Sequence, residues 1–138
     1  MSKNFLFKSW IPLLVLALAL PLAACFRQAQ LKNLVDQPVA GSRNQTLTSA
    51  QVKKVILDAC QKRGWVAREL SPGRISATLD NRSHRAQIEI TFNGSRYSIL
   101  YKDSLNLKYD PSNNTIHNQY NNWVDYLRQD IEIGLARV

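Results

Sequence analysis

The most regular pattern in the chain is a helical spacing of apolar residues that begins after Thr48. The Thr48 side chain can cap a helix, and Gln51 stands three residues later, which is the spacing of a capping box. Gly64 can adopt the backbone conformation in which helices commonly end. The apolar face consists of Val52, Val55, Ile56, Ala59 and Cys60. The sequence therefore predicts an amphipathic helix that starts after Thr48 and ends near Lys62.

After this helix the spacing changes to alternation, which is typical of half-buried strands. We predict one strand over 65–70 and a second over 75–80, joined by a tight turn over 71–74. The turn contains Pro72 at its second position and Gly73 at its third, where φ must be positive in a type II turn.

A second hairpin is predicted around the dipeptide Asn93-Gly94, which favours a type I′ turn. This turn would place Phe92 opposite Ser95 and Ile90 opposite Tyr97, with apolar residues on one face and polar residues on the other. A short additional strand is predicted near 105–109.

The last helical pattern begins near His117. Its apolar positions are Ile116, Tyr120, Trp123, Val124, Leu127 and Ile131. Together the elements predict an α+β fold: a helix, a four- to five-stranded antiparallel sheet and a C-terminal helix, in two layers with both helices on one face. We place this single domain at residues 48–138.

Residues 26–47 are mostly polar, contain Pro38 and Gly41, and lack a helical period. We therefore interpret 25–47 as a modified N-terminus followed by a flexible tether, with a root-mean-square span of roughly 25 Å. Leu34, Val35 and Val39 are the residues that could dock part of it on the domain.

Residues 1–24 have the composition of a signal peptide. Lys3 and Lys8 precede an uncharged stretch over 10–24, whose helical length of about 22 Å is short for a membrane span. The stretch ends in Leu22-Ala23-Ala24-Cys25, which resembles the lipobox of bacterial lipoproteins. The resemblance implies cleavage before Cys25 and lipid attachment to its thiol. Because Phe26 rather than aspartate follows, it also implies an outer-membrane location on the periplasmic face.

The domain itself resembles a group of small uncharacterised proteobacterial lipoproteins from about Thr48 to Ile131. The segments that carry the resemblance are Gly64-Trp65, Arg82-Ser83-His84, 97–107 and 116–124. This resemblance implies a similar fold and the same location, and it implies no activity.

The formal net charge of the chain is +8, and removal of Lys3 and Lys8 with the leader leaves about +6. The excess of basic residues lies between Arg27 and Lys102. Such a surface could face anionic lipid, an anionic envelope polymer or an acidic envelope protein, or it could simply be solvated. Nucleic acid is a poor candidate partner because the basic residues are spread singly and the location is extracytoplasmic.

Catalytic motifs are not evident in the sequence. Cys60 lies on the apolar face of the first helix and is expected to be buried. His84 and His117 are the only histidines, and neither lies in a motif with the spacing of metal ligands, so we predict no metal site and no cofactor.

Aromatic residues offer a candidate ligand groove between the sheet and the last helix. Its residues would be Tyr97, Tyr101, His117, Tyr120 and Trp123. The alternative is that the aromatic residues belong to the core, which their positions on apolar faces favour.

The favoured hypothesis is a non-catalytic binding or envelope-maintenance module held at the outer membrane through Cys25. The alternatives are an envelope hydrolase that uses His84 or His117, and a carrier of small ligands. Nothing in the sequence identifies the ligand or the oligomeric state.

Overall fold

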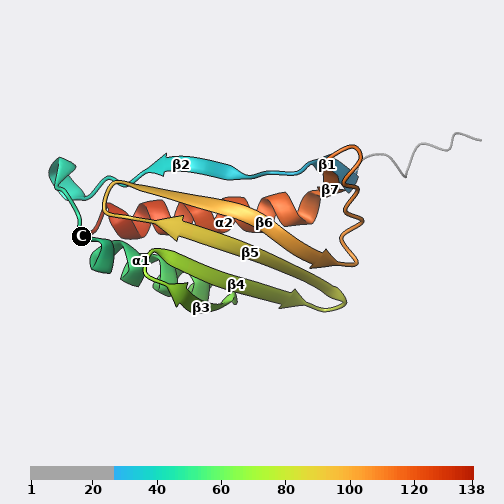
Figure 1. Ribbon diagram of the computed structural model, residues 1–138, viewed down its shortest axis with the longest axis horizontal. Coiled ribbons are helices and arrows are strands. Elements are labelled where there is room, and N and C mark those ends of the chain that lie inside the picture. Colours follow the sequence, from blue (N-terminus) through green and yellow to red (C-terminus); the bar gives the residue numbers. More distant parts are fainter. Residues whose placement is uncertain (1–26) are drawn as a thin grey trace, which may run out of the picture.

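The computed structural model describes residues 27–138, and the predicted signal peptide and lipobox-like sequence lie outside this range. The elements are β1 (Gln28–Gln30), β2 (Leu34–Pro38), the 3-10 turn η2 (Ser42–Asn44), α1 (Ser49–Lys62), β3 (Val66–Ser71), β4 (Arg74–Asn81), β5 (His84–Phe92), β6 (Arg96–Leu105), β7 (Thr115–His117) and α2 (Asn118–Leu135). The main sheet is antiparallel with strand order β2-β6-β5-β4-β3, and β1 pairs separately with β7. Both helices lie on one face of this sheet (Figure 1), so the predicted α+β fold with a C-terminal helix is confirmed.

The core lies between the sheet and the two helices, and alternation along the strands builds it. In β5, Ile88 and Ile90 face the helices and are fully buried, and Ile99 of β6 is buried beside them. Burial of each such side chain contributes about 1.5–3 kcal/mol. The opposite face of the sheet is polar, and there Glu89 forms ion pairs with Arg74 and Lys102.

Both helix starts match the sequence prediction. Thr48 and Gln51 form a complete capping box at the start of α1, and Gly64 adopts a φ of 79° just after the end of the helix. The α2 helix begins after His117, whose Nδ1 accepts a hydrogen bond from the Gln119 backbone N–H at 3.1 Å. These local polar contacts fix where each helix begins.

The β5–β6 hairpin is present, but its turn differs from the prediction. Phe92 lies opposite Tyr97 rather than Ser95, and the Asn93 side chain accepts hydrogen bonds from the backbone N–H groups of Ser95 and Arg96, both at 2.8 Å. The side chain of Asn93 thus stabilises a longer turn than type I′. Between Ile88 and Phe92 the register moves by two residues, so these side chains keep their predicted faces. Beyond an irregularity between Gln87 and Ile88, Ala86 lies opposite Ser104.

The conformation of Gly94 explains why Asn93-Gly94 does not form the predicted type I′ turn. Its φ is not positive, so it does not act as the glycine of a type I′ turn. A Cβ atom at this position would clash with the Leu47 carbonyl oxygen. Glycine is required here because the chain that enters α1 passes directly over the turn.

The prediction of a flexible tether over 26–47 is wrong from Gln28 onward. The β1 strand pairs with β7, and β2 pairs with β6 at the edge of the main sheet. The fifth strand of that sheet is therefore β2 and not the segment 105–109, in which Leu107 is buried outside any strand. Strands at an edge bond through their backbones, so a polar sequence can occupy them without an apolar period.

Candidate functional site

The aromatic groove predicted between the sheet and α2 is filled by the aromatic rings themselves. Tyr97 and Tyr120 are 1% and 0% exposed, and Trp123 is 8% exposed. Tyr101 is half-buried, and its ring packs edge-on against Tyr120 with ring centroids 5.5 Å apart. The structure therefore agrees with the alternative interpretation, in which these residues belong to the core.

Two of these tyrosines bury their hydroxyl groups without a partner. Within residues 27–138, the oxygens of Tyr97 and Tyr120 make no hydrogen bond. Burial raises the pKa of Tyr97 to about 12 and raises the pKa of Tyr120 further. Both therefore stay protonated at neutral pH and act as apolar core residues.

His84 and His117, which are far apart in sequence, lie together in the structure. Their ring centroids are 6.0 Å apart, at the end of the domain where β1 begins. Partial burial lowers the pKa of His117, and the neighbouring His84, Arg27 and Lys108 lower it further. The surroundings of the pair are thus basic. Within residues 27–138, no group of three or more His, Cys, Asp or Glu residues could hold a metal ion.

Cys60 is fully buried on the inner face of α1, as the sequence predicts. Burial raises the pKa of its thiol to about 12. A thiol that stays protonated and inaccessible has no nucleophilic role.

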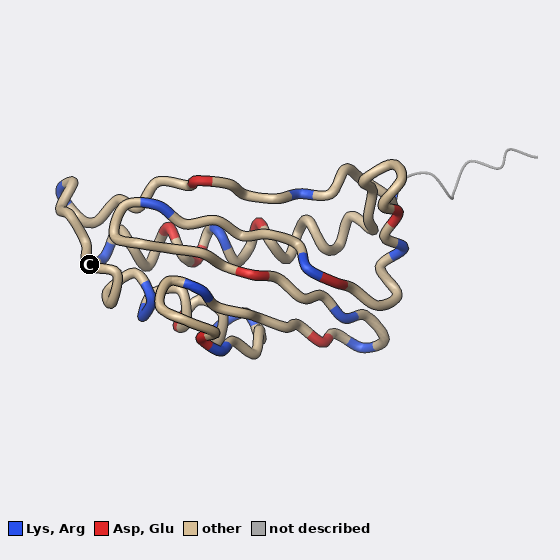
Figure 2. Tube along the Cα trace, viewed as in Figure 1, with Lys and Arg blue, Asp and Glu red and all other residues tan. Residues whose placement is uncertain are grey.

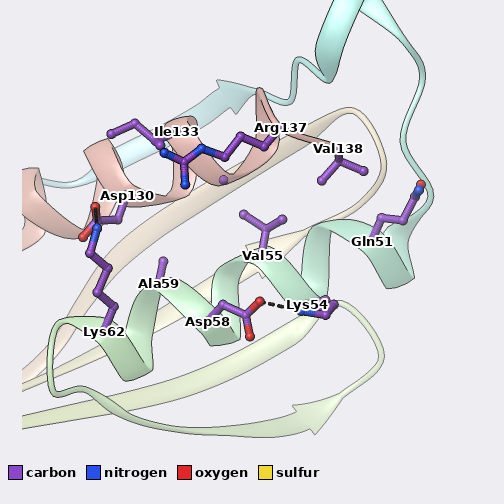
Figure 3. Close-up of a pocket in the computed structure, with 11 residues that line it drawn as sticks. Gln51, Lys54, Val55, Asp58, Ala59, Lys62, Asp130, Ile133, Arg137 and Val138 are labelled. Atoms are coloured by element: carbon purple, nitrogen blue, oxygen red, sulfur yellow. Dashed lines mark hydrogen bonds and ion pairs between the residues drawn. The ribbon is translucent and has the colours of Figure 1, made fainter.

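A groove of about 430 Å³ lies between α1 and α2, on the side of the helices away from the sheet (Figure 3). The residues that line it are Gln51, Lys54, Val55, Asp58, Ala59, Lys62, Asp130, Ile133, Gly134, Arg137 and Val138. Its volume is in the range typical of ligand sites. This groove is the candidate functional site.

Small residues let the two helices approach closely beneath the groove. A Cβ atom at Gly134 would lie 2.6 Å from Cγ1 of Val55, so glycine is needed where α2 crosses α1. Val55 and Ala59 form an apolar floor, and Ile133 rises beside it with 47% of its surface exposed. The groove therefore offers apolar contact area that no other part of the described chain covers.

Charged residues surround this floor, and most of them are already paired. Lys54 and Asp58 are 2.6 Å apart, and Lys62 lies 2.7 Å from Asp130, which also bonds Arg63. The hydrogen bond from Arg63, followed by that from Lys62, lowers the pKa of Asp130, so the carboxylate is charged at neutral pH.

Arg137 differs from the other charged residues of the rim. It forms no ion pair with any residue in 27–138, and its guanidinium group extends along the groove beside Ile133 (Figure 3). The groove thus combines an apolar floor with one cation that is available to a ligand.

Sequence reasoning did not find this groove. Its rim comes from the polar faces of two amphipathic helices and its floor from Val55 and Ala59 at the edge of the apolar face of α1. Their proximity to residues of α2 depends on how the helices cross. The one signal in the sequence is the pair Ile133-Gly134, an apolar and a small residue on the otherwise polar face of α2.

Basic and acidic residues are interspersed over the rest of the described chain (Figure 2). Within residues 27–138, neither helix combines the length and apolar character needed to cross a membrane. No family model, curated protein or solved structure matches the chain.

Proposed function

We propose that the chain is an outer-membrane lipoprotein, anchored through Cys25, that works as a non-catalytic binding module in the periplasm. Its ligand site is the groove between α1 and α2. The observation that carries the proposal is the apolar floor of this groove beside the unpaired Arg137. The anchor is supported by the lipobox-like sequence Leu22-Ala23-Ala24-Cys25.

The chemistry of the groove favours a short apolar segment of an envelope protein that carries an acidic side chain. The floor would bury apolar side chains of the segment, at about 25 cal/mol per Å² removed from water. An acidic group would meet Arg137, which can bind a carboxylate through two parallel hydrogen bonds.

Site-specific photo-crosslinking in the envelope tests this function. A photoreactive residue at Ile133 is expected to form an adduct with one envelope protein through an apolar, acidic segment identified by mass spectrometry. The matched control carries the same residue at Val66, which is 77% exposed on β3 and lies outside the groove. Arg137→Glu should reduce the Ile133 adduct at least tenfold.

Identical adducts from the two positions, or an adduct that Arg137→Glu leaves unchanged, would refute the groove as the ligand site. The anchor is tested separately. Labelled palmitate should enter the wild-type chain and not the Cys25→Ser variant, and equal incorporation would refute lipidation at Cys25.

The same groove favours a second candidate, a carrier of small amphipathic anions. A fatty acid would place its chain on the floor and its carboxylate at Arg137. Saturable binding of decanoate that Arg137→Gln abolishes, without a protein adduct from Ile133, would support this function over the first.

A further inference from the structure

The distance along the chain from Cys25 to the folded domain is short. The β1 strand begins at Gln28, three residues after Cys25. An extended chain covers at most about 3.6 Å per residue, so Gln28 lies within roughly 11 Å of Cys25. A lipid on Cys25 would therefore hold this end of the domain next to the membrane.

The connection between β1 and the domain is firmly held. The buried Asn121 side chain of α2 donates a hydrogen bond to the Gln30 carbonyl oxygen at 2.8 Å and accepts one from the Lys32 N–H at 3.0 Å. Lys32 also pairs with Asp125 at 2.5 Å. The N-terminal strand therefore moves with the domain, and an anchor at Cys25 would fix which end faces the lipid.

The end of the domain around β1 has the composition of a membrane-interface surface. Three cations there, Arg27, Arg82 and Lys108, form no ion pair within residues 27–138, and His84 and His117 lie beside them. Cations close to the surface are attracted by anionic headgroups, at about 1 kcal/mol each.

The acidic residues of this end leave an excess of positive charge. Asp80 is paired with Arg85, and Asp103 and Asp110 are the remaining carboxylates there. Asp110 is largely engaged in its own loop, where it accepts hydrogen bonds from Ser112 and Asn113.

Two exposed apolar side chains lie among these charges. Leu105 is 58% exposed at the end of β6, and Tyr109 is 37% exposed in the loop that follows. Tyrosine and aliphatic residues beside cations are typical of surfaces that rest in the headgroup region.

We propose that the end of the domain formed by β1, β7 and the β4–β5 hairpin rests directly on the anionic phospholipid headgroups of the membrane that holds Cys25. The contact is made by Arg27, Arg82, Lys108, Leu105 and Tyr109. This proposal rests on the lipidation proposed above. The domain would then contact the bilayer directly, in place of the long flexible tether that the sequence predicts.

Two labelled variants of the mature, lipidated chain test this orientation. Ser83→Cys lies in the β4–β5 turn at the proposed membrane end, and Ser95→Cys lies in the β5–β6 turn at the other end of β5. The nine residues of β5 separate the two turns by roughly 30 Å. A thiol-reactive fluorophore would label these positions alone, because Cys60 is buried and lipid blocks Cys25.

The labelled proteins are placed in vesicles of phosphatidylcholine with about a third phosphatidylglycerol, which carry an energy acceptor on the headgroups. We expect the label at Ser83 to be quenched several-fold more than the label at Ser95. Arg82→Asn with Lys108→Asn should at least halve this difference. Asparagine suits both positions, because their φ values of 56° and 52° are positive.

The control for charge is Arg43→Asn with Arg68→Gln, which removes two exposed cations elsewhere and should leave the quenching unchanged. Equal quenching of the two labels in protein that floats with the vesicles would overturn the orientation and leave the anchor intact. Protein that neither floats nor carries acyl mass would refute the anchor and the orientation together. A different outcome is quenching at Ser83 that depends on the amount of protein per vesicle and not on the phosphatidylglycerol content. That result would show that a second copy of the chain, rather than lipid, covers this end of the domain, and it would overturn the proposal.

Discussion

The strap formed by residues 28–38 and the hairpin formed by β5 and β6 are both β structure, yet different forces hold them. Ile88, Ile90 and Ile99 of the hairpin are fully buried against the helices. In the strap, Leu31 and Leu34 are only partly buried against the core, and hydrogen bonds supply the specific contacts. They include those of Asn121 and one from the Tyr101 N–H to Asn33 at 2.8 Å. Apolar burial therefore stabilises the body of the domain, whereas specific hydrogen bonds attach the strap.

This difference predicts how each region fails. Loss of apolar volume should lower the stability of the whole domain, because all elements share one core. Loss of one polar contact to the strap should open the strap alone, since local openings cost less free energy than global unfolding.

The largest effect is expected for Ile88→Ala. Removal of this fully buried side chain leaves a cavity, so the free energy of unfolding should fall by about 3–4 kcal/mol. Urea denaturation measures the loss, and amide hydrogen exchange should accelerate throughout the domain. Leu105→Ala, at a position that is 58% exposed, should change the stability by about 0.5 kcal/mol or less. Faster exchange confined to β5 would contradict the picture of a single shared core.

Asn121→Ala should have the next largest effect, of about 2 kcal/mol, because it leaves the Gln30 carbonyl and the Lys32 N–H without partners. Exchange of the strap amides should rise at least tenfold while that of α1 stays unchanged. Asn122→Ala is the control on the same helix. If exchange of the strap amides rises equally in Asn121→Ala and Asn122→Ala, the Asn121 side chain does not hold the strap.

Asp130→Asn tests a polar contact that joins the two helices rather than the strap. Its pKa is lowered by the hydrogen bonds from Arg63 and Lys62, so the stabilisation is fully present above the unfolded pKa of about 3.9. It is lost as the pH falls through the lower folded pKa.

The variant should therefore be about 1–2 kcal/mol less stable at pH 7 and should lose less stability than the wild type below about pH 4. Urea denaturation across this pH range measures both effects. Asp58→Asn, in a pair whose side chains are 61% and 78% exposed, should cost less than about 0.5 kcal/mol. If the free energy of unfolding falls by the same amount in the wild type and in Asp130→Asn as the pH is lowered, the hydrogen bonds from Arg63 and Lys62 do not lower the pKa of Asp130.

The smallest effect is expected for Tyr120→Phe. Removal of a buried hydroxyl group without a partner should leave the stability unchanged or raise it by up to about 1 kcal/mol. Tyr101→Phe should instead lower it by about 0.5–1 kcal/mol, because it breaks a hydrogen bond to Ser104 of 2.8 Å. Thermal denaturation distinguishes the two. A loss of more than 1 kcal/mol in the Tyr120 variant would show that the hydroxyl group has a partner.

The sequence allowed the helices, the strand faces and the burial of Cys60 to be predicted, because each depends on periodicity or on capping residues nearby. The turn type at Asn93-Gly94 was wrong, since Leu47 passes over Gly94 and the Asn93 side chain builds its own turn. Neither contact leaves a local signal in the sequence.

The strap and the groove could not be predicted for a related reason. The partners of β1 lie in β7, and the groove depends on the crossing of α1 and α2 at Gly134. Both features join residues that are far apart in the chain, and a single sequence gives no measure of such pairs. The predicted aromatic groove was wrong for a different reason. The rings of Tyr97 and Tyr120, which were assigned to a ligand site, are buried in the core.

The pairing of β1 with β7 also sets an order of events in biogenesis. Gln28 pairs with His117, so the first strand of the domain has to wait for one of the last segments to be made. Closing so long a loop carries an entropic cost that is recovered only when the partner strand is already in place. We therefore expect the strap to dock last, after the hairpins and helices have formed. In this order, the acylation that we propose at Cys25 would precede the docking of the strap.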